Sequence, residues 1–422
     1  MSGVPLRPVL GLQLVFMLGF SSVVPFFAAI GQSRYGLDAA AIGAVVGARV
    51  AAQQGMFIVG GALADRFGPR LLLTAGCLLR AIAFGIIAWA PSAPAFVTGV
   101  VLVGLAGALF SPAVDGLIGS IDSERRSRHD GVALPGRGPA PFAALALAGE
   151  TGGIIASLGA ARCMPEHSGT LSLISAGIFL AAALFVHRLI PRTGASGPVA
   201  APAAAASAFP AEPVRVLPLA IAGAALLAVY TQLFSTVPLA LNEHGLSPGH
   251  MGAVAATLSA STLVLQWPIS RLSERLGRCT AVMVGLYAGS AACLVAFAGQ
   301  ALLPAAALPW LFCLVAALVG VAMMLGNPAA KSLIAGGSGR WRATRLALLP
   351  TAGGAAALIC TTASGAVADA HSTLAAWPLA AALPAAMLPV AWYALRPAHE
   401  LTHHSNCPPA SAGSTLEKER TP

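Results

Sequence analysis

Three ionisable side chains stand in the middle of long apolar stretches of the sequence: Arg49, Arg80 and Glu150. A charge at the centre of a bilayer costs about 2.5–3.5 kcal/mol on insertion scales, so each one needs a partner, water or a function. Glu150 is the only acid at this depth, and such a carboxylate can take a proton from one side of a membrane and release it to the other. The alternative is a structural ion pair with an arginine, and the two interpretations are compatible if a substrate competes for that pair.

The two arginines differ in their expected roles. Arg49 shares a helix face with Gln53 and Met56, four and seven residues further on, so this face meets water or protein rather than lipid. We expect Arg49 either to act in function or to pack against the acid. Arg80 is expected to be structural, and Asp115, near the end of its apolar stretch, to act as a gate or a helix cap.

The elements that carry these residues are expected to be membrane-spanning helices. Of the 422 residues, 57% are hydrophobic and 9% are charged, and the mean hydropathy is +0.80. A soluble globular chain carries about 25% charged residues, so this chain has too few to cover a water-facing surface. The long apolar stretches predict an all-α integral membrane protein. Its twelve expected spans lie near residues 9–30, 40–63, 70–90, 94–118, 141–161, 168–190, 216–240, 249–270, 279–299, 305–327, 345–368 and 374–396.

An internal repeat divides these spans into two halves of six. The segment LADRFGPR at 63–70 follows the second span, and LSERLGRC at 272–279 follows the eighth, at an offset of 209 residues. The alignment pairs the charged and glycine residues of the two segments: Asp65 with Glu274, Arg66 with Arg275, and Gly68 with Gly277. Because both copies end corresponding helices, the halves run in the same sense. Parallel six-helix repeats are a transporter plan, with the substrate site between the halves near the middle of the membrane.

Composition also sets the expected domains and orientation. The domains are a first half at 1–190, a linker at 191–214 rich in Pro, Ala and Ser, a second half at 215–396, and a disordered tail at 397–422. With the N-terminus inside, 20 of the 24 Lys and Arg residues fall on the cytoplasmic side, Arg34 and Arg162 fall outside, and two lie within spans. The net charge of +9 therefore reflects the topology of a multi-pass protein of the cell membrane, inner or plasma, with both termini in the cytoplasm. No nucleic-acid partner is needed to explain it.

The segment GGALADRFGPR at 60–70 identifies a family. It matches the signature of the major facilitator superfamily at six positions: Gly61, Leu63, Asp65, Arg66, Gly68 and Arg70. Within that superfamily, residues 48–70 resemble the drug:proton antiporter branch and its MdtH-like multidrug exporters in particular. The resemblance implies two six-helix halves, alternating access and export of drugs or natural products in exchange for protons.

Two features of that branch are absent. Residues 96–110 lack the Arg that many proton-coupled drug exporters carry midway along the fourth helix, and residues 149–160 keep several glycines but lack a Gly-Pro pair. The expectation of proton antiport therefore depends on the remaining resemblance and on Glu150.

Small residues have expected structural roles. We expect Gly61 to allow close helix approach, Gly68 to form a tight turn, and Asp65 to pair with an arginine or cap a helix. Gly149 and Gly153 form a small-xxx-small pattern, which favours close contact between helices.

The cavity of the resembled fold is lined mainly by helices 1, 4, 7 and 10, and the eighth span adds one residue. Aromatic, methionine and amide side chains there would make a large and adaptable pocket, although any one of them could be an ordinary packing residue. The candidates are Gln13, Phe16, Phe20, Tyr230, Gln232, Phe234, Gln266, Trp310 and Met324.

The leading hypothesis is a monomeric secondary transporter that exports small amphipathic organic compounds by proton antiport. The alternatives are a proton-linked transporter of a specific, possibly anionic metabolite, and a non-transporting receptor or scaffold. The sequence shows no P-loop, nucleophile elbow or metal-spaced His cluster, so we expect no enzyme, cofactor or metal. The expected partners are a small-molecule substrate, protons and the lipid bilayer.

Overall fold

The computed structural model describes residues 6–127, 141–189, 214–335 and 342–396. The expected linker up to residue 213 and the expected tail at 397–422 lie outside this part of the chain. The described residues form helices and no strand, and 12 stretches are long and apolar enough to cross a membrane. The prediction of an all-α membrane protein with twelve spans is confirmed.

The first half of the chain forms six of these stretches. Its helices are α1 (Leu6–Ser21), α2 (Phe27–Tyr35), α3 (Ala39–Gly55), α4 (Phe57–Phe67), α5 (Pro69–Trp89), α6 (Ala93–Ser127), α7 (Pro141–Ala161) and α8 (Ser168–Leu189). The first stretch is interrupted by a short 3-10 helix, η1 (Val24–Phe26), where Pro25 has no backbone N–H to continue the α-helical pattern. The second is interrupted at Met56, between α3 and α4.

The second half repeats this arrangement. Its helices are α9 (Val216–Glu243), α10 (His250–Leu276), α11 (Arg278–Leu302), α12 (Leu308–Ala335), α13 (Arg342–Ala370) and α14 (Thr373–Leu395), with the 3-10 helix η2 (Ala305–Ala307) before α12. Gly68 before α5 has φ 81° and ψ 154°, and Gly277 before α11 has φ 79° and ψ 154°. A positive φ favours glycine, so the two aligned glycines make the same turn for the same reason.

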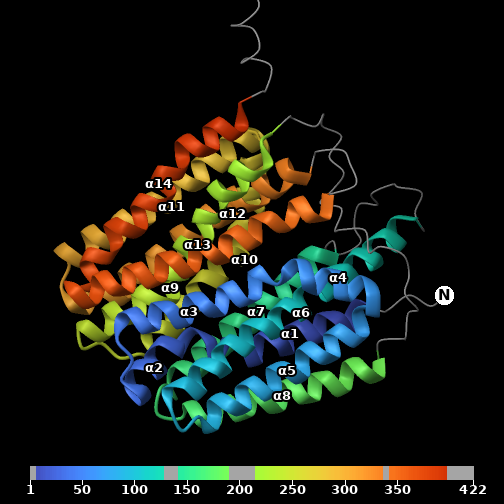
Figure 1. Cartoon of the computed structure of the whole chain (residues 1–422), viewed down its shortest axis with the longest axis horizontal. Coiled ribbons are helices and arrows are strands. Elements are labelled where there is room, and N and C mark those ends of the chain that lie inside the picture. Colours follow the sequence, from blue (N-terminus) through green and yellow to red (C-terminus); the bar gives the residue numbers. More distant parts are fainter. Residues whose placement is uncertain (1–5, 128–140, 190–213, 336–341, 397–422) are drawn as a thin grey trace, which may run out of the picture.

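Two helices from different halves, α3 and α13, lie side by side across the middle of the molecule (Figure 1). A side chain on Gly43 would place its Cβ 2.1 Å from the carbonyl oxygen of Thr361, and one on Gly47 would come within 2.6 Å of the Cα of Leu358. The Thr361 hydroxyl donates a 2.7 Å hydrogen bond to the Gly43 carbonyl. This backbone-to-backbone contact is possible because small residues recur every fourth position along α3.

A second contact between the halves joins α7 to α10. A Cβ on Gly252 would lie 2.4 Å from the Ser157 carbonyl oxygen, and one on Gly249 would lie 2.6 Å from that of Ala161. A Cβ on Gly153 would lie 3.0 Å from the Ser259 hydroxyl oxygen. Gly153, a member of the expected small-residue pattern on α7, therefore faces the second half, as do Ser157 and Ala161 further along the same helix.

The ends of the bundle differ in how the halves meet. At the end where α3 begins, the Asp369 carboxylate of α13 accepts 2.8 Å hydrogen bonds from the backbone amides of Ala39 and Ala40. We call this the closed end. The opposite end carries the turns at Gly68 and Gly277, and we call it the motif end.

Candidate substrate cavity

A cavity of about 760 Å³ lies between the two halves. Its walls come from α1, η1, α2, α3 and α7 of the first half and from α9, α10, α12 and α13 of the second. A pocket of about 300–1,000 Å³ is the size that small organic ligands occupy.

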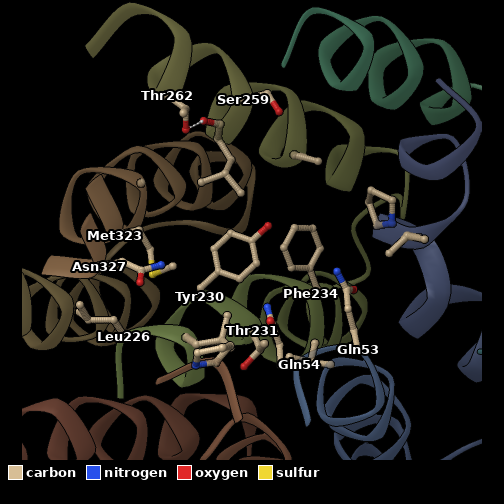
Figure 2. A pocket seen from close by; sticks show the side chains of 18 of the residues that line it. Gln53, Gln54, Leu226, Tyr230, Thr231, Phe234, Ser259, Thr262, Met323 and Asn327 are labelled. Atoms are coloured by element: carbon tan, nitrogen blue, oxygen red, sulfur yellow. Dashed lines mark hydrogen bonds between the residues drawn. The ribbon is translucent and has the colours of Figure 1, made fainter. Parts of the chain in front are cut away.

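Eight of the fourteen predicted site residues outside the repeated motif meet in this cavity. Tyr230 and Phe234 of α9 lie near its centre, 5.4 Å apart between ring centroids, with Gln53 of α3 nearby (Figure 2). The predicted residues that line it are Phe20, Arg49, Gln53, Glu150, Tyr230, Phe234, Gln266 and Met324.

Four predicted cavity residues lie elsewhere, and those predictions are wrong. Gln13 lies beside Gly149 in the contact between α1 and α7, and Phe16 is buried against the ring of Phe110 at 3.7 Å. Trp310 is 79% exposed on the outer surface of α12, where an aromatic side chain can meet lipid. The fourth, Gln232, is 1% exposed inside the protein.

Gln232 is held by a buried polar network between α9 and α13. Its Nε2 donates to Cys360 Sγ at 3.1 Å and to Ser364 Oγ at 3.2 Å. Its Oε1 accepts hydrogen bonds from Ser235 at 3.2 Å and from Thr236 at 2.5 Å. Because both ends of the amide are occupied, Gln232 has a packing role and faces away from the cavity.

Several polar residues of the cavity were not predicted. Ser259 and Thr262 of α10 line it together with Gln266, and Asn327 and Lys331 of α12 line it on another wall (Figure 2). The three residues of α10 are spaced by three and four positions, and the two of α12 by four, so each set forms a stripe on one helix face. Polar stripes at helical spacing in apolar spans are the signal that would have revealed them.

Arg49 faces the cavity from α3 and forms no ion pair with a described residue. Its guanidinium lies 5.6 Å from the ring centroid of Phe20, and its Nη1 is buried without a hydrogen-bond partner among the described residues. A Cβ on Gly104 of α6 would lie 2.2 Å from the Arg49 carbonyl oxygen, so α6 approaches the helix directly behind this residue. Arg49 and Glu150 both line the cavity, but no ion pair joins them in this part of the chain.

Arg80 of α5 lies behind the cavity wall and is 5% exposed. Its guanidinium is 5.2 Å from the rings of Phe20 and Phe179 and 6.0 Å from that of Phe110. Its Nε has no hydrogen-bond partner among the described residues. The Phe20 ring therefore lies close to two guanidinium groups, that of Arg49 at the cavity and that of Arg80 in the protein interior. Attractive cation–π contacts can stabilise this arrangement.

Glu150 faces the cavity from α7. The Ser259 hydroxyl lies where it can donate a hydrogen bond to the Glu150 carboxylate. The phenol of Tyr230 is an electrostatic neighbour of both Glu150 and Arg49. The cavity thus presents an acid from α7 and a guanidinium from α3, with Tyr230 close to both.

The repeated motif lies at the motif end, away from the cavity walls. Arg70 donates a hydrogen bond to the His187 carbonyl, and the guanidinium of Arg66 lies 5.3 Å from the ring of Phe67. Glu274 and Arg275 are exposed at the corresponding end of α10. The side chains of Asp65 and Asp115 lie outside the described part of the structure.

We expected Gly61 to allow a neighbouring helix to approach closely, but in the structure Gly60 does so, where α4 meets α6. A Cβ on Gly61 would have no atom within 4 Å, whereas one on Gly60 would lie 2.0 Å from the Ala108 carbonyl oxygen. The physical reason is helical phase, since one residue turns the side-chain direction by about 100°.

No group of three or more His, Cys, Asp or Glu side chains in the described ranges is arranged to hold a metal ion.

The sequence profile of the Major Facilitator Superfamily matches residues 9–249 and 219–412, and the chain belongs to this superfamily of membrane transporters. It is similar to the multidrug resistance protein MdtH of Aeromonas hydrophila, with 27% identity over 265 residues, which is 62% of this chain and 63% of that protein. It is also 42% identical over 122 residues to an uncharacterised MFS-type transporter of Mycobacterium tuberculosis, a match that covers 29% of each chain. The matches thus span less than two thirds of the length of these curated relatives.

Solved structures agree with this fold. A nucleoside transporter, NupG, superposes with a TM-score of 0.71 at 16% identity, covering 93% of this chain and 100% of that chain. A POT family peptide transporter superposes with a TM-score of 0.70 at 14% identity, covering 93% and 96% of the two chains. At these identities the likeness concerns the fold alone.

Proposed function

We propose that this chain is a secondary active transporter that exports small amphipathic organic compounds by proton antiport with alternating access. The similarity to MdtH supports this function, as does a cavity that combines aromatic rings, methionines and amides. We further propose that the chain acts as a monomer in the cell membrane, with a small-molecule substrate and protons as its partners.

The motif end is assigned to the cytoplasm because the basic residues outside the spans gather there. With this orientation the closed end faces outward, and the contacts of α3 with α13 and of α7 with α10 separate the cavity from the outside. The arrangement is then an inward-facing state of the alternating-access cycle.

The observation that carries the proposal is Glu150, the one acidic side chain among the described residues of the cavity wall. When Glu150 is ionised, it attracts a cationic or hydrogen-bond-donating group of the substrate. A proton from the outside neutralises it and releases that group. Proton and substrate therefore compete for one carboxylate, which is the requirement for exchange.

A direct test uses the purified chain in vesicles loaded with compounds that an overexpression susceptibility panel selects. An imposed pH gradient should accelerate their efflux, and Glu150→Gln should abolish the acceleration. Glu243→Gln is a matched control, because Glu243 accepts hydrogen bonds from Thr373 at the closed end and lies outside the cavity. Unchanged acceleration in the Glu150 variant would exclude this residue as the proton site.

A second candidate function is proton-linked transport of an anionic metabolite. It is favoured by Arg49, whose Nη1 has no hydrogen-bond partner among the described residues. An anion would be repelled by ionised Glu150, so anion and proton would bind together and move in the same direction. The sign of the coupling separates the two functions. Uptake of the anion driven by acid outside would support the second.

A further inference from the structure

Arg49 and Glu150 carry opposite charges on the cavity wall, which also includes Lys331 of α12. Arg49 lies on α3 and Glu150 on α7, and no ion pair joins them. A buried charge left without a partner is costly, and a close ion pair would relieve that cost for both groups. A ligand that carries complementary charges at its two ends would relieve it as well.

The interior arginine strengthens the demand for an anion at Arg49. Arg80 is an electrostatic neighbour of Arg49, and the Phe20 ring lies 5.2 Å and 5.6 Å from the two guanidinium groups. Two positive charges this close raise the local potential. Because Arg80 is 5% exposed and lies outside the cavity wall, Arg49 is the one of these two arginines that can reach a ligand.

The wall formed by α7 and α10 suits a cation that donates hydrogen bonds. The Glu150 carboxylate lies there with the Ser259 hydroxyl beside it. The cavity wall also carries apolar and aromatic side chains, among them Tyr230, Phe234 and Met323 (Figure 2). An aromatic or aliphatic body fits against these side chains.

We propose that the cavity binds amphipathic zwitterions, with an ammonium group at Glu150 and Ser259 and a carboxylate at Arg49. The proposal rests on the transporter function above and defines the substrate class of the same cavity. It agrees with proton antiport, because the ammonium group competes with the proton for Glu150 while the carboxylate contributes affinity at the other pole.

The test is equilibrium binding to the full chain in lipid nanodiscs at neutral pH, without any gradient. Four probes share one biphenyl body. The zwitterion has an aminomethyl group at one end and a carboxylate at the other, and the ester is the methyl ester of that acid. The ethyl analogue, an anion, has ethyl in place of aminomethyl, and the fourth probe carries both changes. A one-ring set with the same four end-group combinations covers a shorter separation of the charges.

The zwitterion should bind about tenfold more tightly than the ester and about tenfold more tightly than the ethyl analogue. Arg49→Gln should remove the preference for carboxylate over ester and retain the preference for aminomethyl over ethyl. Glu150→Gln should do the reverse. Arg271→Gln is the matched control, because Arg271 is an exposed arginine of α10 outside the cavity wall, with its guanidinium 3.6 Å from the Trp267 ring.

Three results would overturn the proposal: equal binding of all four probes, binding of the anion as tight as that of the zwitterion, or no binding of either zwitterion at millimolar concentration. The preferences of the unsubstituted chain decide these points even if a variant does not fold. Because no gradient is used, intact charge preferences together with uncoupled transport would reject proton antiport and leave the zwitterion site standing.

Discussion

The Asp369 carboxylate accepts a 2.8 Å hydrogen bond from the backbone amide of Ala39, and so joins the last turn of α13 to the first turn of α3. The same carboxylate accepts from Ala40, and Asp38 accepts from Ala41 at 2.7 Å. The free amides at the start of a helix favour negative charge. One acid of the second half therefore caps a helix of the first, and this cap holds only while the closed end is closed.

Asp369→Ala should loosen the closed end, because the Ala39 and Ala40 amides lose their acceptor from the other half. We expect the balance between closed and open forms to shift by about tenfold toward opening. Hydrogen–deuterium exchange of peptides covering residues 39–50 and 357–370 should become faster. Glu243→Ala is the control, since that acid joins α9 to α14 within one half. Equal acceleration in both variants would show that the effect is not specific to the contact between halves.

Gly43→Ala should force α3 and α13 apart, because the new Cβ would meet the Thr361 carbonyl oxygen at 2.1 Å. Overpacking of this kind costs about 1–3 kcal/mol. We expect a lower unfolding temperature and loss of transport. Gly55→Ala, on the same helix, has no atom within 4 Å of the added carbon and should leave both unchanged. A Gly43 variant as stable and active as the Gly55 variant would contradict the proposed contact.

Gln232→Leu should destabilise the chain without altering its ligand preferences. The substitution leaves the hydrogen-bonding groups of Ser364 and Thr236 without their amide partner, at a cost of about 1–3 kcal/mol. Thermal unfolding measures the first effect, and binding of the four biphenyl probes measures the second. Changed probe preferences would place Gln232 in the site after all.

Arg80→Met should maintain or raise the unfolding temperature, because replacing a buried charge by an apolar side chain of similar length is often neutral or stabilising. The same variant should weaken the preference for carboxylate over ester, since the potential at Arg49 falls. A sharp loss of folded protein would show instead that the aromatic cage around Arg80 is needed for stability.

The apolar runs predicted the spans well because a bilayer imposes length and composition on every segment that crosses it. The equal turns at Gly68 and Gly277 could also be predicted, because the aligned segments share glycine, the residue that a positive φ favours. The residues that line the cavity were harder to predict from the sequence. Tyr230 and Gln232 lie two positions apart on α9, so helix geometry places them about 200° apart on different faces. The position of α13 then decides which of the two is buried.

Phe16 and Phe20 show the same difficulty within one helix. Both were predicted in the cavity from their spacing of four, yet Phe16 belongs to an aromatic core with Phe110 and Phe179. A helix face has edges, and sequence alone does not fix which partner helix covers each edge. Ser259 and Thr262, by contrast, were visible as a polar stripe and should have been identified.

The cage around Arg80 has a consequence for how the protein is made. Its three rings come from α1, α6 and α8, so the charge on α5 is surrounded by side chains of three other helices. The cage is complete only after α8 has been synthesised. We therefore expect the third span to reach its final packing only after α8 has entered the membrane, and a chain shortened before residue 179 to leave the Arg80 guanidinium without one of its three rings.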